Sequence, residues 1–127
     1  MGRSIFAGAI LAASLSAAIG ALAQTGPKLA AQQSDKYGEY VVDSDRRPIY
    51  LFTADKPGKG QQAESNCYDE CAQVWPPVVA MEEPQAGGNL KPELLGTFKR
   101  KDGRTQVTYG GWPLYYYAKD ASRGEAA

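Results

Sequence analysis

Histidine is absent from this sequence of 127 residues, and only two cysteines are present. Without histidine, the Ser-His-Asp and Cys-His arrangements of nucleophilic enzymes cannot form, and neither can histidine-ligated metal sites or the haem attachment motif. Two cysteines alone are also too few for a zinc or iron–sulfur site. Histidine is also the usual acid–base residue at neutral pH. Its absence and the low number of cysteines favour a non-enzymatic protein without a cofactor or a metal.

An excess of charge of either sign is also lacking, since 14 basic residues balance 14 acidic ones. A near-neutral domain has no net electrostatic attraction to nucleic acid or to an anionic membrane surface. We therefore expect no nucleic-acid partner. The partner expected instead is an envelope protein or a small ligand of unknown identity.

Residues 1–23 have the pattern of a secretory signal peptide. Arg3 supplies one positive charge, residues 4–20 contain no charged residue, and the segment ends in Ala-Leu-Ala, which predicts cleavage between Ala23 and Gln24. A membrane anchor is the alternative, but the apolar stretch is short for a span and is diluted by small residues. We expect a soluble protein in the periplasm or outside the cell, with no transmembrane segment after cleavage.

The remaining chain predicts one β-rich domain at residues 37–127, preceded by a flexible lead-in at residues 24–36 that is polar and lacks a hydrophobic period. Residues 37–43 and 49–54 have strand composition and flank a turn-forming stretch, which predicts a β-hairpin. A second hairpin is predicted at residues 96–109, around an Asp-Gly turn.

One short helix is expected at the Cys-x-x-x-Cys segment, from Cys67 to Val74 or Trp75. Asn66 is its predicted N-cap, and Pro76 with Pro77 ends it, because proline cannot continue a helix. We interpret Trp75, Pro76, Pro77 and the later Trp112 as anchors of the core.

The sequence contains an internal repeat, because residues 47–55 align with residues 112–120 and their Pro, Tyr and Asp coincide. The related segments extend over about 40–58 and 105–124. A duplicated segment predicts two hairpins built alike and packed together. The expected fold is mainly β, with two related antiparallel hairpins that form a small sheet or a partly open barrel.

Each copy contains the motif Tyr-x-aromatic-x-x-Asp, formed by Tyr50, Phe52 and Asp55 and by Tyr115, Tyr117 and Asp120. The pattern resembles the bacterial secreted-repeat family of unknown function, whose members are predicted lipoproteins with this motif. The likeness covers roughly residues 38–120, including the Cys-x-x-x-Cys and Trp-Pro-Pro sequences. It implies an exported envelope protein and brings no established activity or catalytic residues.

This chain departs from the family pattern in two ways. No cysteine stands at the cleavage point to accept a lipid, and the sequence stops at Ala127, whereas members usually continue into a Gly-rich turn and a final strand. We therefore expect either a truncated C-terminus or a sheet with an open edge, and an open edge invites aggregation or a partner.

Cys67 and Cys71 admit two interpretations. In an oxidising compartment the favoured one is a structural disulfide, which pins local shape because it closes so short a loop. The alternative is a thiol-redox or electron-transfer accessory, since a cysteine near a helix N-terminus has a lowered thiol pKa. The Cys-x-x-Cys spacing of known oxidoreductases is absent, however.

The motif residues also admit two interpretations. Asp55 and Asp120 are either a paired-carboxylate site for hydrolysis or, as we prefer, turn residues that accept backbone N–H bonds. The tyrosines are either an aromatic platform for sugar or peptide or, again preferred, part of the core. The favoured function is a non-enzymatic envelope module that is structural or binds a ligand or partner.

Overall fold

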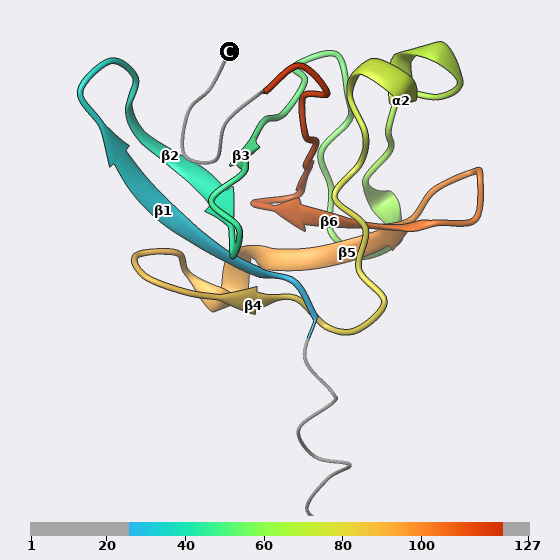
Figure 1. Cartoon of the computed structure of the whole chain (residues 1–127). Coiled ribbons are helices and arrows are strands. Elements are labelled where there is room, and N and C mark those ends of the chain that lie inside the picture. Colours follow the sequence, from blue (N-terminus) through green and yellow to red (C-terminus); the bar gives the residue numbers. More distant parts are fainter. Residues whose placement is uncertain (1–25, 121–127) are drawn as a thin grey trace, which may run out of the picture.

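Two open β-sheets form the described part of the chain, residues 26–120, in the computed structural model (Figure 1). The predicted signal peptide and residues 121–127 lie outside it. One sheet has the strand order β3-β2-β1-β4 and the other the order β5-β6-β7. The strands are β1 (Lys28–Ser34), β2 (Gly38–Asp43), β3 (Pro48–Ile49), β4 (Gln85–Ala86), β5 (Leu95–Lys99), β6 (Thr105–Tyr109) and β7 (Trp112–Pro113). The prediction of a mainly β fold with antiparallel hairpins and one short helix at the Cys-x-x-x-Cys segment is confirmed, and the strands form two open sheets where a single small sheet or a partly open barrel was expected.

The internal repeat corresponds to two hairpins, one in each sheet. β2 pairs with β3 in the first sheet, and β6 pairs with β7 in the second, both antiparallel. The β6–β7 turn consists of Gly110 and Gly111, whose φ angles of 60° and 86° fit a type I′ turn, the two-residue connection that matches strand twist. The predicted hairpin at residues 96–109 is present as β5 and β6.

β1 lies within residues 24–36, so the prediction that this segment is a flexible lead-in is wrong. It pairs with β2 along its whole length, from Leu29 opposite Asp43 to Ser34 opposite Gly38. Its alanines and glutamines have little β propensity, and pairing with β2 and the burial of Leu29 outweigh that preference.

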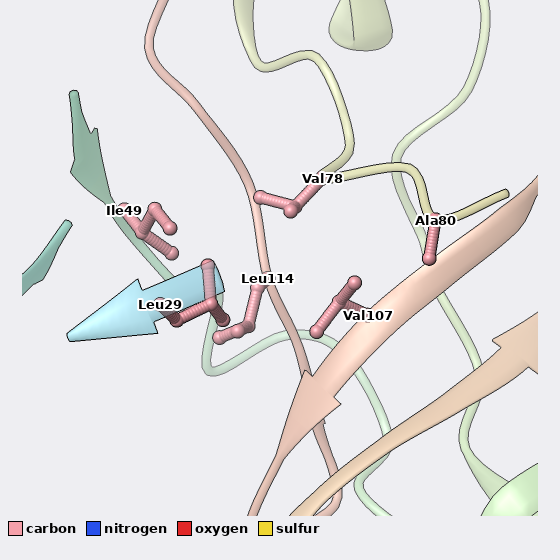
Figure 2. Packing of buried hydrophobic residues seen from close by; sticks show 6 residues of the cluster. All are labelled: Leu29, Ile49, Val78, Ala80, Val107 and Leu114. Carbon is pink, nitrogen blue, oxygen red and sulfur yellow. The ribbon is translucent and has the colours of Figure 1, made fainter. Parts of the chain in front are cut away.

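The hydrophobic core lies between the two sheets (Figure 2). Leu29 of β1 and Ile49 of β3 meet Val107 of β6 there, and Leu29 and Val107 are fully buried. The chain after the helix completes this core with Val78, which belongs to the buried cluster. The Val78 carbonyl accepts a hydrogen bond from the Val107 amide at 2.8 Å. The remaining members of the buried cluster are Ala80 and Leu114.

The helix of the Cys-x-x-x-Cys segment, α2, covers Glu70–Val74. It starts later than predicted, and its N-cap is Asp69, whose φ of 53° and ψ of −119° are not helical. Asn66 does not cap it, because the Asn66 side chain donates to the Ala54 carbonyl at 2.6 Å. The helix ends before Pro76, as predicted. Two 3-10 turns, η1 (Gly60–Gln62) and η2 (Pro92–Leu94), complete the helical structure of residues 26–120.

Candidate functional site

The two copies of the motif meet at their tyrosines. The Tyr50 amide donates to the Tyr115 carbonyl at 2.7 Å, and the Tyr115 amide donates to the Tyr50 carbonyl at 2.8 Å. This exchange is an antiparallel bridge between the chain after β3 and the chain after β7. The repeat therefore joins its two copies through their equivalent residues.

Each motif tyrosine binds the aspartate of the other copy. The Tyr115 hydroxyl donates to Oδ2 of Asp55 at 2.5 Å, and the Tyr50 hydroxyl donates to Oδ2 of Asp120 at 2.9 Å. Hydrogen bonds to a charged acceptor are stronger than those between neutral groups. The side chains thus repeat the reciprocal pairing of the backbone.

The turn at the end of each motif is closed by a backbone hydrogen bond. The amide of Asp55 donates to the Phe52 carbonyl at 3.2 Å, and the amide of Asp120 donates to the Tyr117 carbonyl at 3.1 Å. The Asp55 carboxylate accepts a backbone amide too, but from Asn66, eleven residues later. The turn interpretation is right about position and incomplete about the carboxylates, which join the two copies.

Five rings form an aromatic cluster around this bridge: Tyr50, Phe52, Trp75, Tyr115 and Tyr117. Trp75 stacks on Tyr117 with ring centroids 4.3 Å apart, and Phe52 stacks on Tyr115 at 4.4 Å. Tyr50 and Phe52 contact the edge or face of Trp75 in T-shaped geometry. Tyr115 is fully buried, whereas the other four rings are partly exposed. The cluster thus has an inner ring and a solvent-facing side.

A buried polar network supports the inner ring. Ser65 lies 2.6 Å from the Tyr115 hydroxyl, and Arg100 donates to Ser65 at 3.2 Å. The same guanidinium donates to Gln106 at 2.8 Å, and Gln106 donates to the Leu114 carbonyl. Because an unpaired buried polar group is costly, this mutual pairing fixes the position of each member.

The network shifts the pKa values of two groups at its ends. Burial, followed by the hydrogen bond to Asp55, raises the pKa of the Tyr115 hydroxyl above its ordinary value. Burial also opposes ionisation of Asp102, but its hydrogen bonds with Arg100 and Arg104 outweigh this and hold its pKa below the usual range. At neutral pH, therefore, Tyr115 is a neutral donor and Asp102 a charged partner of Arg100.

The predicted disulfide between Cys67 and Cys71 is confirmed, with Cα atoms 5.2 Å apart. Cys67 is fully buried and Cys71 is partly exposed. The Cys67 carbonyl accepts a bond from Arg100 at 2.8 Å, and the Cys71 carbonyl accepts one from the Trp75 amide at 2.8 Å. The disulfide thus lies between the polar network and the aromatic cluster.

The predicted core anchors have different environments. Pro77 is buried and forms a bridge with Tyr115, while Trp75 and Pro76 are partly exposed. Trp112 is also partly exposed, in β7. Trp75 therefore belongs to the surface side of the aromatic cluster as much as to the interior.

Sequence reasoning missed the polar network entirely. Arg100 stands in a Lys-Arg-Lys run that reads as solvated surface, yet its side chain is buried and its guanidinium lies 4.4 Å from the centroid of the Tyr68 ring. Ser65 stands in a polar loop. Gln106 alone carried a signal, because it is a polar residue inside a predicted strand.

Clefts of about 710, 580 and 330 Å³ open on the surface of residues 26–120. Neither Asp55 nor Asp120 lines any of them, so these clefts give no support to a paired-carboxylate hydrolase. In the same part of the chain, no group of three or more acidic or cysteine side chains is placed to hold a metal ion. No helix there is long and apolar enough to span a membrane.

Comparison with known protein families matches residues 31–79 and 96–127 to a family described as a secreted repeat of unknown function. The first matched stretch contains Tyr50 and Asp55, and the second contains Tyr115 and Asp120. No curated protein and no solved structure matches the chain. Because the two stretches cover more than half of the sequence, the chain belongs to this family of secreted repeats.

Proposed function

We propose that this protein is a non-enzymatic binding module of the cell envelope, and that the exposed side of the aromatic cluster is its contact surface. The proposal rests on the difference in burial among the residues of the motif and the cluster. Tyr115 and Asp55 are buried and bonded to each other, while Tyr50, Phe52, Trp75 and Tyr117 retain exposed area. Rings held by a rigid polar support lose little conformational freedom when a ligand binds.

A carbohydrate of the envelope fits this surface. The apolar C–H face of a sugar ring stacks on an aromatic face, and its hydroxyls need polar groups at the margin of the site. The Tyr50 hydroxyl and the carboxylate of Asp120, two partly exposed residues, bond each other at this cluster. The cluster therefore combines apolar faces with polar neighbours, as a site for sugars requires.

Tryptophan fluorescence tests the proposal directly. Trp75 and Trp112 are the two tryptophans of the chain, so the Trp112→Phe variant leaves Trp75 as the sole tryptophan emitter. Titration of this variant with chitotetraose and maltotetraose should give a saturable change in emission with at least one of them. In the same background, Phe52→Ala should weaken that binding about tenfold, which corresponds to about 1.4 kcal/mol.

Tyr37→Ala is the matched control, because Tyr37 is an exposed ring in the β1–β2 turn, outside the cluster. Its affinity should equal that of the parent. The proposal fails if neither sugar binds, or if Tyr37→Ala and Phe52→Ala weaken binding equally.

The destination of the protein is part of the same proposal. Family membership supports export, and we infer delivery to the periplasm or beyond through cleavage between Ala23 and Gln24. Mass spectrometry of the protein recovered from the periplasm or the medium should give a mature chain that starts at Gln24. A chain that retains residues 1–23 would contradict this.

A thiol-redox role is the second candidate, and the partial exposure of Cys71 is the observation in its favour. The complete burial of Cys67 opposes it, because a thiolate left there would be desolvated. The reduction potential distinguishes the two candidates.

A further inference from the structure

We propose that the outer edge of β5 binds an extended basic segment of a partner protein as an additional β-strand. This site is separate from the aromatic cluster and does not depend on the function proposed for it. Its elements are the outward backbone groups of Leu95 and Thr97 and the clefts beside them. The following observations carry the proposal.

The direction of the β5 backbone groups follows from the bonds of β6. Val107 donates its amide to Val78 at 2.8 Å and accepts at its carbonyl from Leu114 at 3.0 Å, both on the side away from β5. Thr97 is the residue opposite Val107 in the register. In an antiparallel pair, opposite residues either bond each other or both point away. The N–H and C=O of Thr97 therefore point out of the sheet.

The outer edge of β5, beside which η1 packs, accepts hydrogen bonds from other elements or donates them only near its two ends within residues 26–120. At one end the side chain of Gln61 accepts from the Lys99 amide at 2.7 Å and donates to the Lys99 carbonyl at 3.5 Å. At the other end the Leu95 amide donates to the Pro92 carbonyl. Between them, the N–H and C=O of Thr97 and the carbonyl of Leu95 have no hydrogen-bond partner within residues 26–120. Such groups are a template for another strand.

A cleft borders β5 on each face of its sheet. Thr97 and Thr105 line the cleft of about 710 Å³, together with residues 80–86. Gly96 and Thr108 line the cleft of about 580 Å³, together with residues 57–60. Thr105 and Thr108 are three residues apart in one strand, so their side chains point to opposite faces. An added strand would place alternate side chains in the two clefts, which is how sheet-edge sites obtain specificity.

Charge selects the kind of segment that fits. Glu82 and Glu83 line the larger cleft, which has no lysine or arginine in its lining. The smaller cleft contains Glu93 and Lys59 beside apolar groups. Lysine or arginine side chains on one face of the added strand would meet the carboxylates of the larger cleft, and aliphatic side chains would enter the smaller one. An extended segment that alternates basic and aliphatic residues matches both.

The probe for this site is the peptide acetyl-Lys-Val-Lys-Val-Lys-Val-Lys-amide, and its matched control replaces every lysine by glutamate. Each is added to the ¹⁵N-labelled full chain. The lysine peptide should bind saturably, should shift the amide resonance of Thr97, and should slow hydrogen exchange at that amide at least about tenfold. The glutamate peptide should bind at least about tenfold more weakly.

Three variants test the backbone and the charge separately. Thr97→Pro removes the outward N–H without removing a bond to β6, as an edge strand tolerates, and should weaken lysine-peptide binding at least about tenfold. Thr97→Val keeps the N–H and should bind like the parent. The double change Glu82→Lys and Glu83→Lys alters exposed side chains and should lower affinity for the lysine peptide. If Thr97→Pro fails to fold, two N-methylated lysine peptides provide the same test from the ligand side. Methylation at the lysines removes the N–H groups that face Thr97 in an antiparallel addition, and methylation at the valines removes those that face it in a parallel one, so one of the two peptides should lose binding.

Three outcomes would overturn the proposal. The first is equal binding of the lysine and glutamate peptides, and the second is undiminished binding when either partner lacks its edge N–H groups. The third is absence of binding by the lysine peptide. Self-association of the chain that Thr97→Pro abolishes would then assign the edge to a second copy.

Discussion

At the scale of single residues, the two motif tyrosines occupy equivalent positions and differ in burial. Tyr115 is fully buried, and its hydroxyl contacts both Asp55 and Ser65. Tyr50 is partly exposed and bonds Asp120. A hydroxyl removed from a buried network leaves its partners unsatisfied, whereas water replaces one near the surface. The repeat therefore places different energetic demands on its two copies.

Tyr115→Phe should lower the free energy of unfolding by about 1–3 kcal/mol, because it leaves a carboxylate and a hydroxyl without their buried partner. Tyr50→Phe should cost at most about 1 kcal/mol. Chemical denaturation of the two variants beside the parent measures both changes. Equal losses would show that burial does not distinguish the two copies.

Stability should fall as the pH rises above the ordinary tyrosine pKa of about 10. Burial, and then the hydrogen bonds to Asp55 and Asp43, raise the pKa values of Tyr115 and Tyr116 in the folded protein. The unfolded chain therefore loses these protons first. The stabilisation is complete below pH 10 and is lost as the pH approaches the folded pKa, by about 1.4 kcal/mol per unit for each group.

Denaturation midpoints at about pH 9 and pH 11 measure this loss. Tyr115→Phe and Tyr116→Phe should each reduce the difference between the two midpoints. The same difference in both variants and the parent would mean that these tyrosines do not cause it.

Residue pairing is also where prediction from sequence reached its limit. The spacing of Tyr50, Asp55, Tyr115 and Asp120 identified the repeat, but spacing does not specify which tyrosine meets which aspartate. That choice depends on the bridge between the copies, a contact between residues 65 apart. Arg100 was missed for the same reason, since its partners lie up to 35 residues away.

At the scale of elements, local propensity predicted some strands and missed others. The hairpin of β5 and β6 follows from strand composition around an Asp-Gly turn, and the structure confirms it. β1 lacks such a signal, because Ala and Gln fill it and only Leu29 is fully buried. Its pairing with β2 is a tertiary preference that composition does not carry.

The start of α2 also depends on tertiary structure. Asp69 has the φ and ψ of the first central residue of a type II′ turn, and the Cys71 amide donates to the Tyr68 carbonyl across it at 3.0 Å. Glycine is usual at this position, because a side chain is strained there. The disulfide and the bond from Arg100 to Cys67 hold the segment in this conformation, so α2 begins at Glu70.

Asp69→Gly should therefore stabilise the protein by about 1 kcal/mol, since it relieves strain at a positive φ. Glu70→Gly is the control within the helix and should destabilise by about 0.5–1 kcal/mol, because glycine there only adds flexibility to the unfolded chain. Denaturant midpoints of the two variants check the signs. A loss of stability in Asp69→Gly would contradict the assigned strain.

At the scale of the whole molecule, the disulfide distinguishes a structural module from a redox protein. Its loop spans only residues 67–71, so reduction should lower the free energy of unfolding by roughly 2 kcal/mol in the chain-entropy model and leave the fold intact. Near-ultraviolet circular dichroism and denaturation of the reduced protein test this.

Equilibration with glutathione gives the potential, which for a structural bridge should lie below about −300 mV. A potential above roughly −200 mV would favour the thiol-redox candidate.

The two motif copies act as one unit in this account, joined by their reciprocal tyrosine–aspartate bonds and supporting one aromatic surface. A double-mutant cycle with Tyr115→Phe and Asp55→Ala tests that claim most directly, with the free energy of unfolding as the readout. We predict a coupling energy of at least about 1 kcal/mol, because each change alone breaks the same buried bond. Additive effects, within about 0.5 kcal/mol, would show that the bond between the copies does not hold them together.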